Sequence, residues 1–261
     1  EIQSTSPSPL LDDTVRVQGL TMASTLVDPQ NDRRPILWAG ARWQTYLYDP
    51  EGQTYDRFDG IVIVQDDTTG PNQDTFFDLV DTADVVEITV TVDEYFTTTQ
   101  GMVLLAPVTA VSIIDTLSKR PDPVELDITD FMDGGVLNPL AEKYEGEYVV
   151  IRDVVTSDRN ASTGTFRIND GLGNHMFMYD QSGYFTLRTT HRLTGLTNYE
   201  PPVDGTTLSY IRGVIQTRDD GFYIAPMYPG DIEVSVTPPS ISSVKRNLAQ
   251  VMTNESVTIT A

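Results

Sequence analysis

The chain has 261 residues, enough for one large or two ordinary domains, and no cysteine, which excludes disulfide bonds, thiolate metal sites and cysteine nucleophiles. Its 38 acidic and 17 basic residues give a formal net charge of −21, and a field of that sign repels phosphate backbones and argues against nucleic acid as a partner. The most apolar run, 102–114, is short and contains Pro107, so we expect no membrane insertion.

The first half of the chain alternates apolar and polar residues in the way that predicts β-strands. We expect an opening strand at 13–20, "DTVRVQGL". A hairpin should follow, in which "TYLY" and "IVIV" flank the acidic turn 49–60. A second hairpin is expected from "VVEITVTV" at 85–92, a polar turn, and "GMVLLAPV" at 101–108.

The second half repeats this order. Its opening strand is expected at 147–154, "EYVVIRDV", and its first hairpin joins "TFRI" to "HMFMY" through 169–174, "NDGLGN". Asn, Asp and Gly tolerate the positive φ angles that a tight reversal needs. The second hairpin joins "LSYIRGVI" at 208–215 to "FYIAPMYP" at 222–229. Five short strands with a spacer between the third and fourth predict a small closed barrel of the oligonucleotide/oligosaccharide-binding (OB) type, with a β-sandwich as the alternative.

The segment between the repeats carries linker and helix signals. Two prolines stiffen a linker that we place at 119–136. Asn138 as N-cap, Pro139 at the first helical position and Gly146 as terminator predict a short helix. Such a helix would close one end of the second barrel.

Three segments carry a resemblance to a known group of proteins: "YLYDPEGQTYDRFDGIVIV", "FRINDGLGNHMFMYD" and "RGVIQTRDDGFYIAPMYPGDI". They resemble the OB-like domains of secreted bacterial proteins, including those attached to extracellular nucleases and to long surface proteins with C-terminal sorting signals. The resemblance covers most of 10–236. It implies tandem OB-like barrels and a secreted, cell-surface location, and it says little about function.

The end of the chain, "PPSISSVKRNLAQVMTNESVTITA", resembles the first strands of an immunoglobulin-like module. Such a module would normally continue past Ala261, so we expect the chain to be a piece of a longer protein or its last strand to be completed by something else. Val257 and Ile259 lie on the apolar face of the expected strand "SVTITA". A lone strand leaves its backbone edge unpaired, which favours assembly with another copy or a neighbouring surface-protein domain by strand addition.

The expected fold class is therefore all-β: two tandem five-stranded OB-like barrels with a short helix, plus a C-terminal immunoglobulin-like strand segment. We place the first barrel at 1–118, the linker at 119–136, the second barrel at 137–237 and the last segment at 238–261. Eight apolar residues are expected to point mostly into the barrels: Val15, Val17, Val62, Val90, Val150, Ile168, Met178 and Ile211.

The first long loop, "VDPQNDRRPILWAGARW", is the strongest binding candidate because it holds both tryptophans of the chain beside three arginines. Indole rings and guanidinium groups suit sugars, bases or a partner protein. The alternative is that Trp43 caps the barrel while the arginines neutralise the acidic surface. The candidate binding residues are Arg33, Arg34, Trp38, Arg42 and Trp43.

The sequence offers few candidate metal-binding or catalytic residues. The turn at 49–60 offers Asp49 and Glu51 as a candidate Ca²⁺ site, but it lacks the Gly and Glu that an EF-hand needs, so a long hairpin turn is the preferred interpretation. Otherwise we expect no cofactor and no metal. His175 and His191 show no triad or metal spacing and are expected at the barrel rim, so we expect the chain not to be an enzyme.

Two functions remain open. The first is a non-catalytic structural or adhesive segment of an extracellular protein, a fibre or appendage subunit that assembles by strand addition. The alternative is a polymer-binding accessory module of a secreted hydrolase, with glycan or nucleic acid as the polymer.

Overall fold

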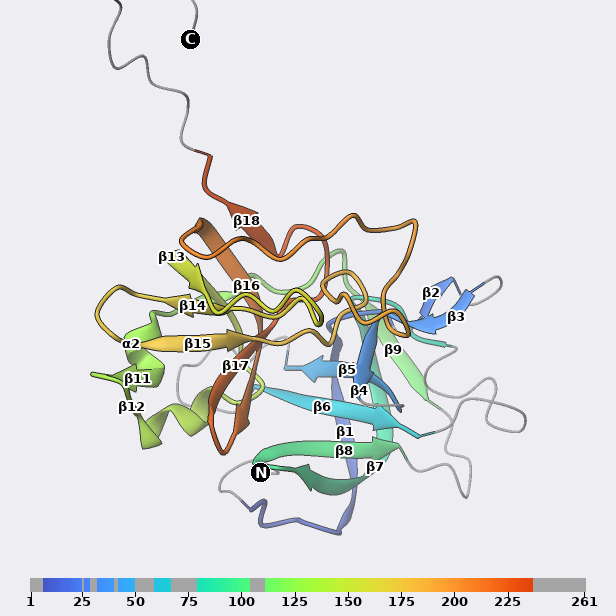
Figure 1. Cartoon of the computed structure of the whole chain (residues 1–261). Helices are drawn as coiled ribbons and strands as arrows, with labels where there is room; N and C mark the ends of the chain where they lie inside the picture. Colours follow the sequence, from blue (N-terminus) through green and yellow to red (C-terminus); the bar gives the residue numbers. More distant parts are fainter. Residues whose placement is uncertain are drawn as a thin grey trace, which may run out of the picture.

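The computed structural model of the chain describes residues 7–24, 26–28, 32–39, 42–49, 59–66, 79–103 and 111–236. These residues form a mainly β fold in which two sheets, one from each half, lie side by side (Figure 1). No helix among them is long and apolar enough to cross a lipid bilayer. The expectation of a mainly β protein is confirmed.

The first half forms a sheet whose central strands pair in a ring. Its strands are β1 (Thr14–Thr21), β2 (Leu26–Asp28), β3 (Asp32–Pro35), β4 (Leu37–Ala39), β5 (Arg42–Tyr48), β6 (Gly60–Gln65), β7 (Asp84–Tyr95), β8 (Thr98–Val103) and β9 (Ser112–Thr116). The order is β1-β5-β6-β8-β7, and β7 pairs again with β1. β6 and β8 run parallel, β4 and β9 extend the sheet, and β2 and β3 make a separate ribbon.

The second half forms a closed five-stranded barrel with the same cyclic order. Its strands are β10 (Val124–Glu125), β11 (Met132–Asp133), β12 (Val136–Leu137), β13 (Tyr148–Ser157), β14 (Arg167–Asn169), β15 (His175–Met178), β16 (Thr207–Arg218), β17 (Gly221–Ala225) and β18 (Ile232–Val234). The ring runs β13-β14-β15-β17-β16 and returns to β13, with β15 parallel to β17. The expected closed five-stranded barrel is therefore present.

Two short helices precede this barrel. α2 (Ile128–Phe131) lies within the segment expected to be a linker, and so do β10, which pairs with β13, and β11. The predicted helix is the 3₁₀ helix η2 (Pro139–Tyr144), in which the Asn138 side chain accepts a hydrogen bond from the Leu140 amide at 3.0 Å. Phe131 of α2 and Ala141 of η2 are fully buried in the barrel core, so both helices seal it.

Each half has its own apolar core. Val17 and Val90 belong to the core of the first half, with Val15 packed against it, and Ile168, Met178 and Ile211 belong to that of the second. Val150 is buried at 4% exposure but lies outside these clusters.

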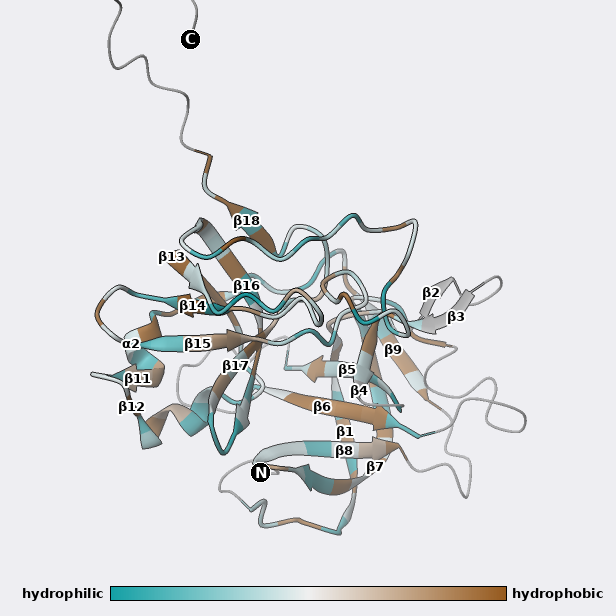
Figure 2. Cartoon of the chain, viewed as in Figure 1, coloured by the Kyte–Doolittle hydropathy of each residue, from teal (hydrophilic) through white to brown (hydrophobic). Residues whose placement is uncertain are grey.

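Val62 differs from its predicted place inside the first barrel. It packs in a third apolar cluster, between the halves. Its neighbours Ile61 and Ile63 take the inward positions, because side chains alternate along a strand. All residues of β6 are buried, so both faces of this strand are covered. The strand is mostly hydrophobic (Figure 2).

The cluster between the halves joins Tyr46 and Tyr48 of the first half to Tyr148, Val214 and Met227 of the second. The closest backbone approach occurs at Gly60 and Gly146, where a Cβ on Gly60 would lie 2.2 Å from the Gly146 carbonyl oxygen. Only glycine lets the two backbones meet at this distance.

A buried amide network completes this junction. The side chains of Gln44 and Gln181 exchange two hydrogen bonds of 3.0 and 2.9 Å. The Tyr46 hydroxyl donates to the Gln181 oxygen at 2.5 Å and accepts from Gln216 at 2.6 Å. All four residues are at most 5% exposed. Hydrogen bonds are directional, so this network fixes how one half sits on the other.

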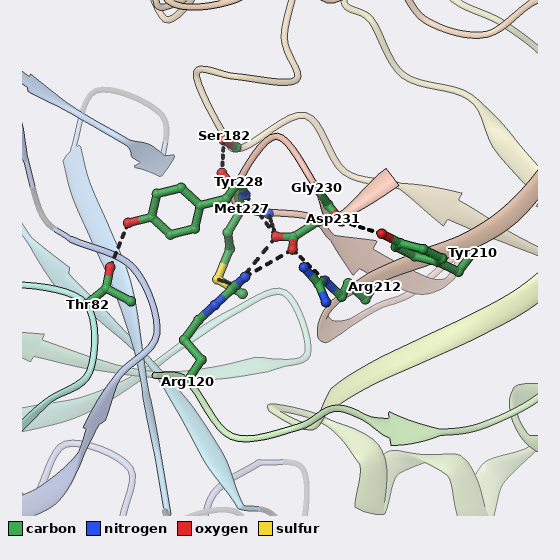
Figure 3. A network of polar contacts seen from close by, with 9 residues as sticks. All are labelled: Thr82, Arg120, Ser182, Tyr210, Arg212, Met227, Tyr228, Gly230 and Asp231. Atoms are coloured by element: carbon green, nitrogen blue, oxygen red, sulfur yellow. Dashed lines mark hydrogen bonds and ion pairs between the residues drawn. The ribbon is translucent and has the colours of Figure 1, made fainter. Parts of the chain in front are cut away.

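A buried carboxylate holds the connecting segment in place (Figure 3). Asp231 is fully buried and accepts hydrogen bonds from Arg120 at 3.0 Å, from Arg212 at 2.8 Å and from the backbone amides of Met227 and Tyr228. The Tyr228 hydroxyl then reaches Thr82 of the first half at 2.7 Å.

Candidate functional site

A cleft of about 330 Å³ opens on the outer face of the barrel in the second half. Strands β14, β15 and β17 and the last residue of β16 contribute to its lining, together with the loops that follow β13 and β15. Its charged and aromatic lining residues include Arg167, Phe177, Tyr179, Arg188, Arg218 and Tyr223.

Aromatic rings lie in the cleft because side chains alternate along its strands. Met176 and Met178 point into the core, which leaves Phe177 between them facing outward. Phe177 lies opposite Tyr223 on parallel β17, and their rings stack with centroids 4.7 Å apart and an interplanar angle of 18°. The Arg167 guanidinium lies 4.9 Å from the Phe177 ring, which adds a cation–π contact.

Arg218 lies beside this stack. Its guanidinium is 4.3 Å from the centroid of Tyr179 and 4.8 Å from that of Tyr223. Among the described residues, no carboxylate lies within ion-pair distance of Arg218, in contrast to Arg167 and Arg188. Arg218 hydrogen-bonds Tyr179, and its positive charge is not neutralised by a carboxylate in this part of the chain.

The acids of the cleft are held by arginines. Arg188 donates to Asp180 at 2.6 Å, and the side chain of Asp180 is only 4% exposed. Arg167 pairs with the more exposed Asp158 at 3.3 Å. These pairs place carboxylate oxygens and N–H donors along the same cleft, a combination that can hydrogen-bond a polyhydroxylated ligand from both sides.

The titrating aromatic groups of the cleft are neutral near pH 7. Burial, followed by the hydrogen bond to Asp220, raises the pKa of Tyr223 to about 12. Burial also raises the pKa of Tyr179. His175 lies on the same face of β15, 5.4 Å from the Phe177 ring, and burial and then Arg167 lower its pKa.

The predicted tryptophan and arginine loop does not lie in this cleft. Trp38 and Trp43 are direct neighbours across β4 and β5. Trp38 stacks on His191 of the second half with ring centroids 4.4 Å apart, and its amide donates to the Gln181 carbonyl at 3.0 Å. Trp43 packs against the core of the first half, and Arg42 pairs with Asp66 at 3.7 Å.

Other predicted residues fall partly or wholly outside the described parts. The backbone of Arg33 and Arg34 belongs to β3, but their side chains lie outside the description. Asp49 is exposed, while Glu51, Val257 and Ile259 lie outside the described residues. The predictions of a Ca²⁺ site and of an assembly strand at these positions therefore stay predictions. Within the described ranges, no three His, Cys, Asp or Glu side chains converge on a common metal position.

The cleft residues were missed by sequence reasoning, although one signal was available. In "HMFMYD" the two methionines occupy the inward positions, so alternation puts Phe177 on the outer face of the third strand of the barrel. An aromatic residue on the outer face of a barrel strand is a binding signal. Arg218 and Tyr223, by contrast, reach the cleft only through pairing of strands distant in sequence.

Comparisons with known proteins do not assign the chain to a family. No protein-family model and no curated protein matches the chain. A solved structure of a murine DNA-binding protein bound to double-stranded DNA aligns over 82% of this chain and 95% of its own, with 8% identity and a TM-score of 0.29. A similarity at this level does not establish a shared fold.

Proposed function

We propose that the chain is a non-catalytic extracellular module that binds a carbohydrate polymer in the cleft of its second half. The observation that carries the proposal is the stacked pair of Phe177 and Tyr223, flanked by Arg167 and Arg218. The apolar face of a sugar ring can pack against the ring edges of this stack, while its hydroxyl groups bind the surrounding guanidinium and carboxylate groups. The volume of about 330 Å³ is at the small end of ordinary ligand sites.

The fold supports the same proposal. We propose that both halves are OB-like barrels, and the ring order of each, in which the third and fifth strands run parallel, supports this. OB barrels bind oligosaccharides or oligonucleotides on the face of their second and third strands. The cleft lies on β14 and β15, which hold these positions in the second barrel.

Charge favours a glycan over a nucleic acid. The net charge of −21 opposes a phosphate backbone, and two of the three arginines in the cleft are already paired with aspartates. A neutral or weakly charged sugar chain meets no such repulsion.

The test is a glycan array followed by calorimetry on the purified chain. Tyr223→Ala should weaken binding about tenfold, roughly 1.4 kcal/mol, the scale of one aromatic stacking contact. Tyr210→Ala is the matched control, since Tyr210 lies on β16 eight residues before Arg218 and does not line the cleft. Absence of binding to any glycan, or equal affinities for wild type and Tyr223→Ala, would refute the proposal.

A structural role is the second candidate, and the junction between the halves favours it. The shared apolar cluster and the buried glutamine network suit a stiff spacer, since domains that move against each other have smaller and more polar contacts. In this case the chain would be a unit of a surface fibre or appendage. Small-angle scattering that shows a flexible pair of halves would speak against it.

A further inference from the structure

The hairpin tip between β7 and β8 of the first half carries two exposed aromatic rings. Tyr95 is 48% exposed and Phe96 is 58% exposed, and their rings meet edge to face at 4.7 Å. Phe96 adopts a φ of 55°, the left-handed region that Gly or Asn occupies more readily in hairpin turns. The turn itself gives no reason for a bulky ring here, and strained positions of this kind cluster at ligand sites.

Buried hydrogen bonds attach this tip to the second half, directly beside the cleft. The Thr98 hydroxyl donates to the Thr217 carbonyl at 2.7 Å, and the Thr217 amide donates to the Thr98 hydroxyl at 3.2 Å. Glu145 accepts from the Thr99 amide at 2.9 Å and also from the Thr217 hydroxyl. Thr217 immediately precedes Arg218, so the tip and the cleft are held in one fixed arrangement.

Arg218 connects the two aromatic surfaces. Its guanidinium lies 4.8 Å from the Tyr223 ring of the cleft, and 5.7 and 5.9 Å from the Phe96 and Tyr95 rings of the tip. Aromatic rings of both halves thus surround a guanidinium that has no carboxylate partner among the described residues. This sequence of aromatic ring, guanidinium and aromatic ring suits the consecutive units of a polymeric ligand better than one compact small molecule.

We infer that the Tyr95 and Phe96 tip forms a second subsite, so that the ligand is a linear glycan running from the cleft across Arg218 onto the first half. The inference rests on the proposed function and adds to it the form of the ligand and a binding role for the first half. One sugar unit contacts the ring edges of Phe177 and Tyr223 in the cleft, and a later unit stacks on Phe96. The Arg218 donors bind oxygen atoms of the sugar between them.

The experiment measures affinity against chain length by calorimetry, with the cello-, xylo- and chito-oligosaccharide series from two to six units as probes. In the wild type, the hexasaccharide of the series that binds should bind about tenfold more tightly than the disaccharide. In Phe96→Gly this ratio should fall to about two, while the melting temperature holds or rises because glycine relieves the left-handed strain. Leu172→Ala, at another hairpin tip and 75% exposed, is the matched control and should keep the ratio.

The outcomes separate this inference from the proposed function. Equal affinities for short and long chains, or a ratio unchanged in Phe96→Gly, would overturn the second subsite and leave the cleft proposal standing. No binding of any oligosaccharide by the wild type would overturn both. Binding of an eight-residue oligothymidine that is lost in Tyr223→Ala would overturn the glycan assignment.

Discussion

Glu147 should make the stability of the protein fall as the pH rises. It lies in the junction between the halves at 3% exposure, where it accepts a hydrogen bond of 3.0 Å from the Tyr48 hydroxyl. Burial, followed by the charge of Asp59 from the first half, raises the pKa of Glu147 from 4.5 to about 8. The folded protein therefore holds a proton on this carboxyl group at pH values at which the unfolded chain has lost it.

The sign and size follow from linkage between proton binding and folding. The stability that this proton provides is fully present below about pH 4.5, declines above it, and is lost as the pH passes about 8. One proton corresponds to at most about 1.4 kcal/mol per pH unit, which sets an upper limit of about 5 kcal/mol over this interval. The effective dielectric constant of about 20 that applies even at buried sites lowers the expected value to roughly 2 kcal/mol.

Glu147→Gln tests this reasoning, because glutamine resembles the protonated acid and still accepts from Tyr48. Urea denaturation at pH 5, 6, 7, 8 and 9 should give equal stabilities at pH 5 and a variant more stable by about 2 kcal/mol at pH 9. Glu200→Gln, at an exposed position, controls for the change in net charge. A stability difference between wild type and Glu147→Gln that stays constant with pH would refute the assignment of the proton to this site.

Three further predictions concern the junction, the buried carboxylate and the tail. Gly60→Ala should lower the free energy of unfolding, measured by thermal denaturation, by about 2–4 kcal/mol, because its Cβ would meet the Gly146 carbonyl. Gly230→Ala, whose Cβ would make only one ordinary contact, should lower it by under about 0.5 kcal/mol, and similar losses for the two variants would contradict the close approach. Asp231→Ala should lower the free energy of unfolding by about 3–5 kcal/mol, since it leaves the Arg120 and Arg212 guanidinium groups without their shared partner. Asp122→Ala, at an exposed position, should leave the stability nearly unchanged, and an equally small loss for Asp231→Ala would show that water replaces the buried carboxylate. Deleting 251–261 should reduce any self-assembly seen by light scattering, and unchanged assembly, or a monomer with the tail intact, would rule out strand addition.

The strands of both halves could be predicted because their signals are local. Alternation along 147–154 and 208–215 matches β13 and β16, and the turn "NDGLGN" falls between β14 and β15. The N-cap of η2 was also visible in Asn138 and Pro139. Each of these features depends on residues within a few positions of one another, which is the range over which a pattern carries information.

The junction could not be predicted in the same way. Gln44, Gln181 and Gln216 are buried, although polar side chains of this type are usually exposed. Gln181 hydrogen-bonds both Gln44 and Gln216, and Tyr46 hydrogen-bonds Gln181 and Gln216, across separations of 35 to 170 residues. The stack of Trp38 on His191 is likewise a contact between the halves. The composition of the tryptophan loop suggested a binding site, but the contacts of Trp38 with the second half could not be read from that composition.

The glutamine network and the composite aromatic surface are connected by geometry. Arg218 and Phe96 come from different halves. The 5.7 Å distance from the Arg218 guanidinium to the centre of the Phe96 ring is kept only if the halves keep one relative position. The apolar cluster alone is a weak constraint, because hydrophobic contact is not directional. A slip between the halves would leave buried amides without partners, at about 1–3 kcal/mol for each group. The network therefore penalises displaced arrangements, and the Thr98 and Thr217 bonds extend that constraint to the ligand surface.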